Sequence, residues 1–104
     1  MSRFVFEDEK FYDVTKNSTD GFFRKGFRVS VFTDGSVMVD NVYEGKVDCY
    51  SRYEVAKWPD ERMDFEARWN EDYILIDYNP GMFVTKAEYK KMADNAEYVT
   101  LSDD

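Results

Sequence analysis

Residues 27–43 read FRVSVFTDGSVMVDNVY, and this stretch decides the fold. Apolar and polar residues alternate from Phe27 to Val31 and resume at Val37 and Val39, which is the pattern of strands with one buried face. The turn-forming run Thr33-Asp34-Gly35 lies between the two alternating segments. The stretch therefore predicts an antiparallel hairpin.

The length of the turn determines which side chains lie opposite each other. A two-residue Asp-Gly turn would place Asp40 opposite Val29, on the core face. A three-residue loop with Gly35 in the left-handed conformation pairs Val29 with Val39 instead. It also sets Arg28 opposite Asp40 on the solvent face, where we expect an ion pair. Because a one-residue slip moves every side chain to the other face, the sequence favours the three-residue loop.

Short segments rich in valine, isoleucine and aromatic residues continue along the chain between turn residues, as is typical of a β domain. Further strands are expected at Val47–Val55, Met63–Trp69, Tyr73–Tyr78 and Met82–Val84, with early ones at Arg3–Phe6 and Phe11–Val14. Asn79-Pro80-Gly81 is the turn signal between the last two of the later strands. The single cysteine, Cys49, falls on the apolar side of its strand and is expected to be a small buried side chain.

One helix is marked by a capping box, in which Thr85 and Glu88 satisfy backbone donors at the helix start. Four apolar residues follow at helical spacing: Tyr89, Met92, Ala93 and Ala96. We expect this stripe to pack on one face of the sheet and the acidic tail, residues 101–104, to fray. The expected fold is α+β, a mostly antiparallel sheet of five to seven strands with one C-terminal helix, in a single domain spanning residues 1–104.

The residue types that are missing exclude several kinds of site. The chain has no histidine and one cysteine, so neither a His- or Cys-ligated zinc site nor a Ser-His-Asp or Cys-His catalytic group can be built. Its five glycines are too far apart for a phosphate-binding loop, and no calcium loop of EF-hand spacing occurs. We therefore expect no cofactor, no metal and no catalytic activity.

The charge is strongly negative and unevenly distributed. The net charge is -8, and residues 34–77 contain twelve acidic and five basic residues. Such a field repels nucleic acid and anionic lipid, so neither is expected as a direct partner. The chain has no apolar run long enough to span a membrane, and acids stand where a signal peptide has its apolar segment. We expect a cytoplasmic protein.

The densest acidic stretch is WPDERMDFEARWNEDY, residues 58–73, with six acids, two arginines and four aromatic residues. Alternate residues of a strand lie roughly 6.5–7 Å apart, and neighbouring phosphates along a DNA strand are separated by about 7 Å. If Val47–Val55 and Met63–Trp69 are neighbouring strands, their acids form one face that imitates a phosphate backbone, with aromatic side chains as anchors. The expected partner-binding residues are Asp40, Asp48, Tyr50, Glu54, Trp58, Asp60, Glu61, Asp64, Glu66, Glu71 and Asp72.

In size, charge and composition the whole chain resembles the small, acidic, aromatic-rich and cysteine-poor inhibitors of host defence that phages encode, the anti-restriction and anti-CRISPR proteins. The resemblance involves no shared sequence motif. It implies a non-catalytic inhibitor that presents a DNA-mimicking face to the basic groove of a nucleic-acid enzyme, such as a host defence nuclease. The site of action would then be the cytoplasm of the host cell.

Three other interpretations stay open. The acids can belong to an ordinary solvated sheet face, in which Arg52 and Arg68 pair with them across strands. The chain can be a structural or adaptor domain that meets a protein partner, or a second copy in a homodimer, through a sheet edge or an aromatic face. Paired carboxylates can also hold a metal ion in a hydrolase, although the run from Asp60 to Arg68 has arginine where metal-dependent nucleases have lysine.

Overall fold

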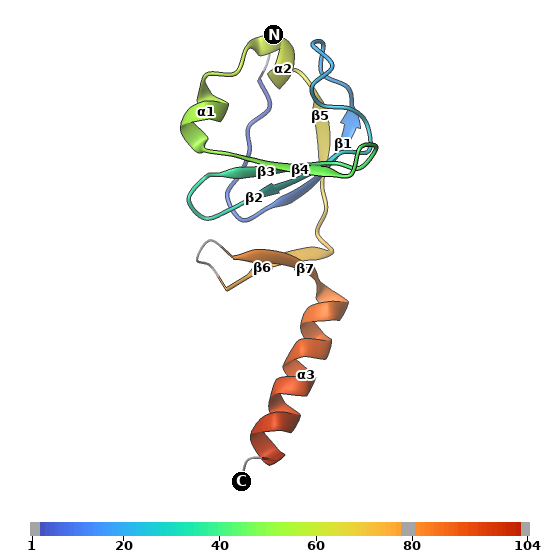
Figure 1. Cartoon of the computed structure of the whole chain (residues 1–104), viewed down its shortest axis with the longest axis vertical. Coiled ribbons are helices and arrows are strands. Elements are labelled where there is room, and N and C mark those ends of the chain that lie inside the picture. The colour runs from blue at the N-terminus through green and yellow to red at the C-terminus, as the bar shows by residue number, and fades with distance from the viewer. Residues whose placement is uncertain (1–2, 78–80, 103–104) are drawn as a thin grey trace.

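The computed structural model describes residues 3–77 and 81–102, with the side chains of the last helix described as far as Asp94. Within these residues, seven strands form two antiparallel sheets, one of five strands and one of two. The molecule is elongated, with extents of 58 × 25 × 22 Å. The five-stranded sheet and two short helices form one end, here called the body, and β6, β7 and α3 extend from it as an arm (Figure 1). The expected α+β class is confirmed.

The larger sheet has the strand order β4-β3-β2-β1-β5. Its strands are β1 (Phe11–Lys16), β2 (Arg28–Val31), β3 (Val37–Asn41), β4 (Lys46–Tyr50) and β5 (Glu66–Trp69). The first four form an antiparallel meander, and β5 returns to pair with β1. Since β4 and β5 lie at opposite edges, the strands at Val47–Val55 and Met63–Trp69 are not neighbours, and the condition for one continuous acidic face is not met.

The hairpin predicted from residues 27–43 is confirmed in its register. Val29 pairs with Val39, Arg28 lies opposite Asp40, and Gly35 has a φ of 80° in the loop. The expected ion pair between Arg28 and Asp40 is not one of the four that the described residues form. Arg28 Nη1 instead donates a hydrogen bond of 3.4 Å to the hydroxyl of Tyr73, which belongs to the arm.

The strand expected at Val47–Val55 ends at Tyr50, because Ser51 starts helix α1 (Arg52–Ala56). The Ser51 hydroxyl accepts a hydrogen bond from the backbone N–H of Glu54, and the Glu54 carboxylate accepts one from the N–H of Ser51. This capping box satisfies two donors that a strand would have offered to a neighbour.

The faces of β4 are the reverse of the expected ones. Tyr50 lies opposite Val37, on the core side of the sheet, whereas Cys49 lies opposite Met38 on the other side. Cys49 is exposed, so the expectation that it is buried is wrong. The turn after β3 sets the register of this edge strand, and a shift of one residue exchanges its two faces.

The strand expected at Met63–Trp69 is also shorter than predicted. Helix α2 (Asp60–Met63) takes up its beginning, and β5 starts only at Glu66. The expected strand at Arg3–Phe6 is not formed, although its Phe4 N–H donates a 2.7 Å hydrogen bond to the Met63 carbonyl.

Three other predicted strands are confirmed. These are β1 at Phe11–Lys16, β6 at Tyr73–Ile76 and β7 at Met82–Thr85. Tyr78 and the first two residues of the turn at 79–81 lie outside the described residues.

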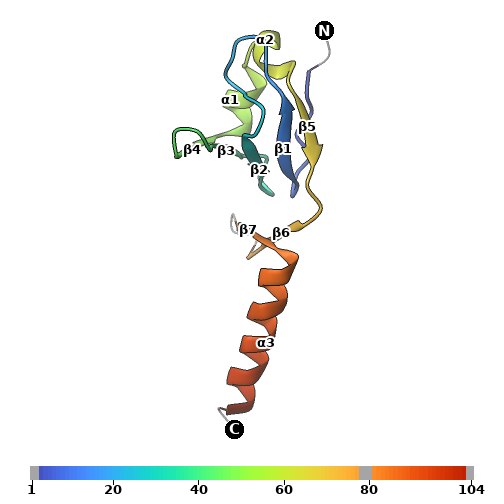
Figure 2. The same ribbon diagram turned by 90° about the vertical axis from the view of Figure 1, so that its right-hand side faces the viewer.

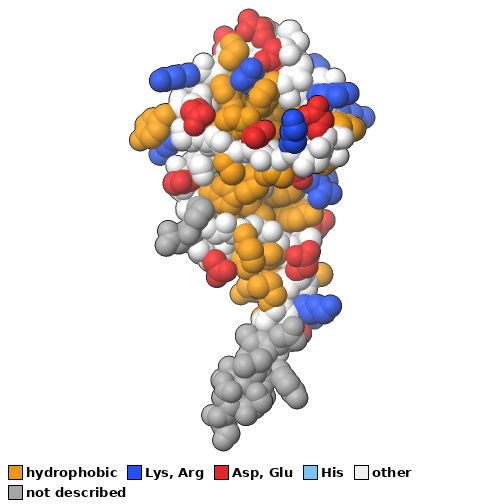
Figure 3. All heavy atoms as spheres, viewed as in Figure 1, with side chains coloured by type: hydrophobic (Ala, Val, Ile, Leu, Met, Phe, Trp, Pro, Cys, Tyr) orange, Lys and Arg blue, Asp and Glu red, His pale blue; other side chains and the backbone are white. Residues whose placement is uncertain are grey.

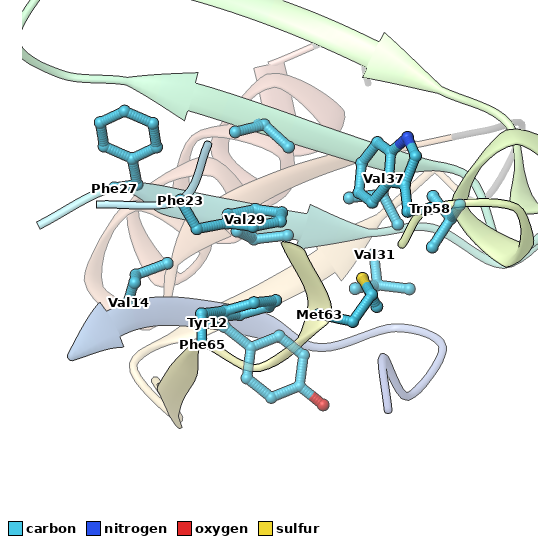
Figure 4. Close-up of a cluster of buried hydrophobic side chains, with 12 residues drawn as sticks. Tyr12, Val14, Phe23, Phe27, Val29, Val31, Val37, Trp58, Met63 and Phe65 are labelled. Atoms are coloured by element: carbon cyan, nitrogen blue, oxygen red, sulfur yellow. The ribbon is translucent and has the colours of Figure 1, made fainter. Parts of the chain in front are cut away.

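The core lies between one face of the larger sheet and the segments that cross it. Sheet residues such as Val29, Val31 and Val37 have at most 1% of their surface exposed. Phe23, from the loop after β1, is fully buried and stacks on Phe65 at 4.1 Å between ring centroids. Trp58 and Met63, from the region of the two short helices, close the cluster (Figure 4).

The arm packs on the opposite face of the sheet. The ring of Tyr73 stacks on Phe11 at 4.1 Å, and Phe83 contacts Phe32 at 5.7 Å between centroids. These contacts bury Phe11 and Phe32, which lie on the side of the sheet away from the main core. The hairpin of β6 and β7 is thereby attached to the body through one of its faces.

Helix α3 (Lys86–Ser102) begins as predicted, with a 3.1 Å hydrogen bond from the Glu88 N–H to the Thr85 hydroxyl. It does not pack on the sheet but points away from the body (Figure 2), so that part of the prediction is wrong. Tyr89 and Met92 are 47% and 43% exposed. The tail expected to fray lies partly in the helix, and residues 103–104 are outside the described part of the chain. No helix in that part is both long and apolar enough to cross a membrane.

Candidate functional site: the acidic edge along β5

The eleven residues expected to bind a partner do not form one face. Four of them lie on β3, β4 and α1: Asp40, Asp48, Tyr50 and Glu54. Six lie on α2, on β5 or in the segments that follow these elements: Asp60, Glu61, Asp64, Glu66, Glu71 and Asp72. The two groups are on strands at opposite edges of the sheet or beside them, so they are separate surfaces.

The group on β3, β4 and α1 is not a continuous patch. Asp48 lies opposite Val39 on the core side of the sheet, whereas Asp40 lies opposite Val47 on the other side. The Glu54 carboxylate caps α1. Tyr50 is half-buried, and this burial raises the pKa of its hydroxyl.

Trp58, the eleventh residue, belongs to the core and not to an exposed surface. It is 9% exposed and packs against the rings of Phe22 and Tyr50 at centroid distances of 5.2 and 5.0 Å. Its carbonyl accepts a 2.8 Å hydrogen bond from Arg3 Nη1. The side chain therefore packs the short helices on the sheet. Because its ring is buried, it cannot anchor a partner as expected.

The remaining six acids follow one another along α2, β5 and the turn after β5, and we call them, with Glu9, the acidic edge. Two grooves border β5 and contain several of these acids. The β5 groove, beside the N-terminal segment, is lined by Arg3, Phe4, Val5, Thr15, Asp64, Phe65, Glu66 and Ala67. The hairpin groove, between the body and the arm, is lined by Glu9, Trp69, Glu71, Tyr73, Ile74, Leu75 and Lys86.

Asp64 is held in place in the β5 groove by Thr19. The backbone N–H of Thr19 donates a 2.8 Å hydrogen bond to one carboxylate oxygen, and its hydroxyl donates to the other. These bonds, the hydroxyl first, lower the pKa of Asp64. The carboxylate is therefore a fixed negative charge at neutral pH.

The hairpin groove combines acids with aromatic rings and already contacts a cation of its own chain. Lys10 Nζ lies 4.1 Å from the centroid of the Trp69 ring and forms an ion pair with Glu7. The hydrogen bond to Glu7 raises the pKa of Lys10. An ammonium or guanidinium group of another protein could bind here in the same way, on an aromatic face with carboxylates beside it.

The sequence reasoning missed Glu9, which lines the hairpin groove with Glu71. Glu9 has a φ of 67°, in the left-handed region, and its N–H donates a 3.0 Å hydrogen bond to the Val31 carbonyl. The acidic run at residues 7–9 is visible in the sequence, but its position next to Glu71 depends on the path of the whole chain.

The arginines of the acidic stretch neutralise acids elsewhere. Arg62 pairs with Asp20 at 2.9 Å, and Arg68 pairs with Asp13 at 3.3 Å. Within the part of the chain that the structure describes, five acids of the acidic edge have side chains that form neither an ion pair nor a hydrogen bond: Glu9, Glu61, Glu66, Glu71 and Asp72. The same is true of Asp40 and Asp48 near the opposite edge of the sheet.

Two of the open interpretations depend on which groups meet at these acids. Arg68 forms a cross-strand ion pair as expected, but with Asp13 of β1 and not with an acid of the expected face. Arg52 lies beside Gly35 and is in none of the four ion pairs of the described residues. Among residues 3–77 and 81–94, no three acids or cysteines are grouped in a way that could hold a metal ion.

Comparison of the chain with models of protein families, with curated proteins and with solved structures finds no match.

Proposed function

We propose that the protein is a non-catalytic binding protein that uses the acidic edge along β5 to engage a basic surface of a protein partner. The observation that carries the proposal is the set of five acids of the acidic edge that form no ion pair among the described residues, at a place where both local arginines pair with other acids. Repulsion among unneutralised acids opposes folding. The positive charges of a cationic partner would offset this repulsion in the complex, which gives a reason for such a surface.

The partner class that best fits this surface is a nucleic-acid enzyme, such as a host defence nuclease, whose groove normally receives phosphates. Carboxylates of α2, β5 and the following turn would replace phosphates, and Trp69 and Tyr73 would supply aromatic contact area. Trp69 is 45% exposed, and a partner would contact its ring beside Lys10, whose Nζ lies 4.1 Å from the ring centroid. In this proposal the protein is an inhibitor that competes with DNA.

The test is affinity capture from bacterial lysate on the immobilised protein, at low and at high salt, with the bound proteins identified by mass spectrometry. The proposal expects a nucleic-acid enzyme that elutes at high salt and that duplex DNA displaces, because charge contacts are screened and DNA occupies the same groove.

Two variants with equal changes of net charge localise the surface. Glu66→Lys with Glu71→Lys reverses the acidic edge, and Glu44→Lys with Asp48→Lys reverses two exposed acids near the opposite edge. We expect the first to weaken binding of the captured enzyme by about tenfold or more and the second to leave it nearly unchanged. Capture that resists salt, or equal loss in both variants, would refute the proposal.

A further inference from the structure

The outer face of the arm hairpin is apolar and is not covered by the body. Tyr73, Leu75 and Phe83 lie on the face that packs against the sheet, so their neighbours along the strands lie on the other face. On that outer face Ile74 lies opposite Val84, and Ile76 lies opposite Met82. Met82 is 47% exposed and Ile74 and Ile76 are half-buried, whereas Val84, between them, is buried. The exposed part of the outer face therefore lies at Ile74, Ile76 and Met82.

Helix α3 continues this apolar surface. Tyr89 lines a groove together with Ile74 and Ile76, and Met92 follows on the exposed stripe of the helix. Hydrophobic side chains gather over the hairpin in a band flanked by charged groups (Figure 3). A two-stranded hairpin is marginally stable alone, and a helix of this length draws most of its stability from packing. A partner that covers this apolar surface would therefore stabilise the hairpin and the helix of the arm.

The charges along α3 indicate which partner fits. The first half of the helix contains Lys86, Lys90 and Lys91 against the single acid Glu88. The sequence of the second half contains Asp94 and Glu97 and no basic residue. A second copy that runs antiparallel would place its acidic half beside the basic half of the first, and the reverse, about a two-fold axis. The helix is thus complementary to itself in charge.

We infer that the arm is a homodimerisation surface, in which the α3 helices of two copies pack antiparallel through the stripe of Tyr89 and Met92. The end of each helix then reaches the outer face of the hairpin of the other copy and covers Ile74, Ile76 and Met82. This arrangement leaves the acids of α2 and β5 free in each body, so a dimer presents two such surfaces, whereas the hairpin groove shares Ile74 with the dimer interface.

The test measures molar mass by light scattering and sedimentation over a dilution series. The parent protein is expected to shift from dimer to monomer on dilution. Tyr89→Glu with Met92→Glu should raise the dissociation constant by more than about tenfold, because charges enter the apolar seam. The matched control, Tyr53→Glu with Val47→Glu, changes one exposed tyrosine and one exposed aliphatic residue of the body and should dimerise like the parent.

A second pair of variants tests the antiparallel charge pattern without changing the apolar stripe. Lys90→Glu with Lys91→Glu makes the helix acidic, and Asp94→Lys with Glu97→Lys makes it basic. Each variant alone should be monomeric at concentrations at which the parent is a dimer, and an equal mixture should form a heterodimer. A parent that stays monomeric at the highest soluble concentration, or a dimer that survives the arm variants, would overturn the inference.

Discussion

Asp64 links the acidic edge to the stability of the body. Thr19 donates a backbone and a hydroxyl hydrogen bond to its carboxylate, which lowers the pKa of Asp64 from its ordinary value of 3.8. A depressed pKa in the folded state means that the charged carboxylate contributes stability above pH 3.8, and that this contribution is lost as the pH falls through the lower folded value.

The variant Asp64→Asn should therefore lower the free energy of unfolding at neutral pH and have progressively less effect as the solution becomes strongly acidic. Urea unfolding of the variant and the parent across this pH range measures the difference. Asp48→Asn, at an exposed acid of the opposite edge strand, is the control and should show little difference at any pH. A deficit of Asp64→Asn that stays constant with pH would show that the charge of the carboxylate is not what Thr19 stabilises.

Among the secondary-structure elements, α1 depends on its capping box more than on burial, because Val55 is its only buried residue within the described structure. Ser51→Ala removes the acceptor for the Glu54 N–H and should cost about 0.5–2 kcal/mol of stability. Glu54→Gln keeps an acceptor for the Ser51 N–H and should cost less. Urea unfolding of both variants measures the two losses, and equal losses would mean that the carboxylate charge matters more than the hydrogen bond.

The same element shows why part of the fold could not be predicted. The capping pair at Thr85 and Glu88 predicts a helix start because no competing pattern surrounds it. The equivalent pair at Ser51 and Glu54 follows a segment in which apolar and polar residues alternate, and that alternation favoured a strand. The hairpin at 27–43 was predicted to the register, since its turn length and its two faces are local information.

At the scale of the whole molecule, the sequence could not show which strands meet. Alternation identifies β4 and β5 as strands, but their places at opposite edges follow from the return of β5 to β1, which is a non-local pairing. For the same reason Glu9 was missed and Asp48 was assigned to a face it does not share with Glu66. An apolar stripe such as that of Tyr89 and Met92 predicts that a helix face will be covered, but it does not specify which surface covers it.

Helix α3 contacts little besides β7 in the described structure. If a second copy covers α3, the backbone amides of the helix should exchange hydrogen slowly in the dimer. In the monomer they should exchange faster, because the helix opens locally. Amide protection in α3 should therefore rise with protein concentration, while protection in β2, at the centre of the sheet, should not change. Hydrogen exchange followed by mass spectrometry on either side of the dimer dissociation constant measures this.

The variant Tyr89→Glu with Met92→Glu should keep the low protection of α3 at every concentration, which separates dimerisation from crowding or aggregation. Protection in α3 as high as in β2 at all concentrations, in the parent and the variant alike, would contradict the prediction. It would mean that the hairpin and the start of α3 suffice to hold the helix. The apolar outer face of the hairpin would then need another explanation, since burying it would no longer account for the stability of the arm.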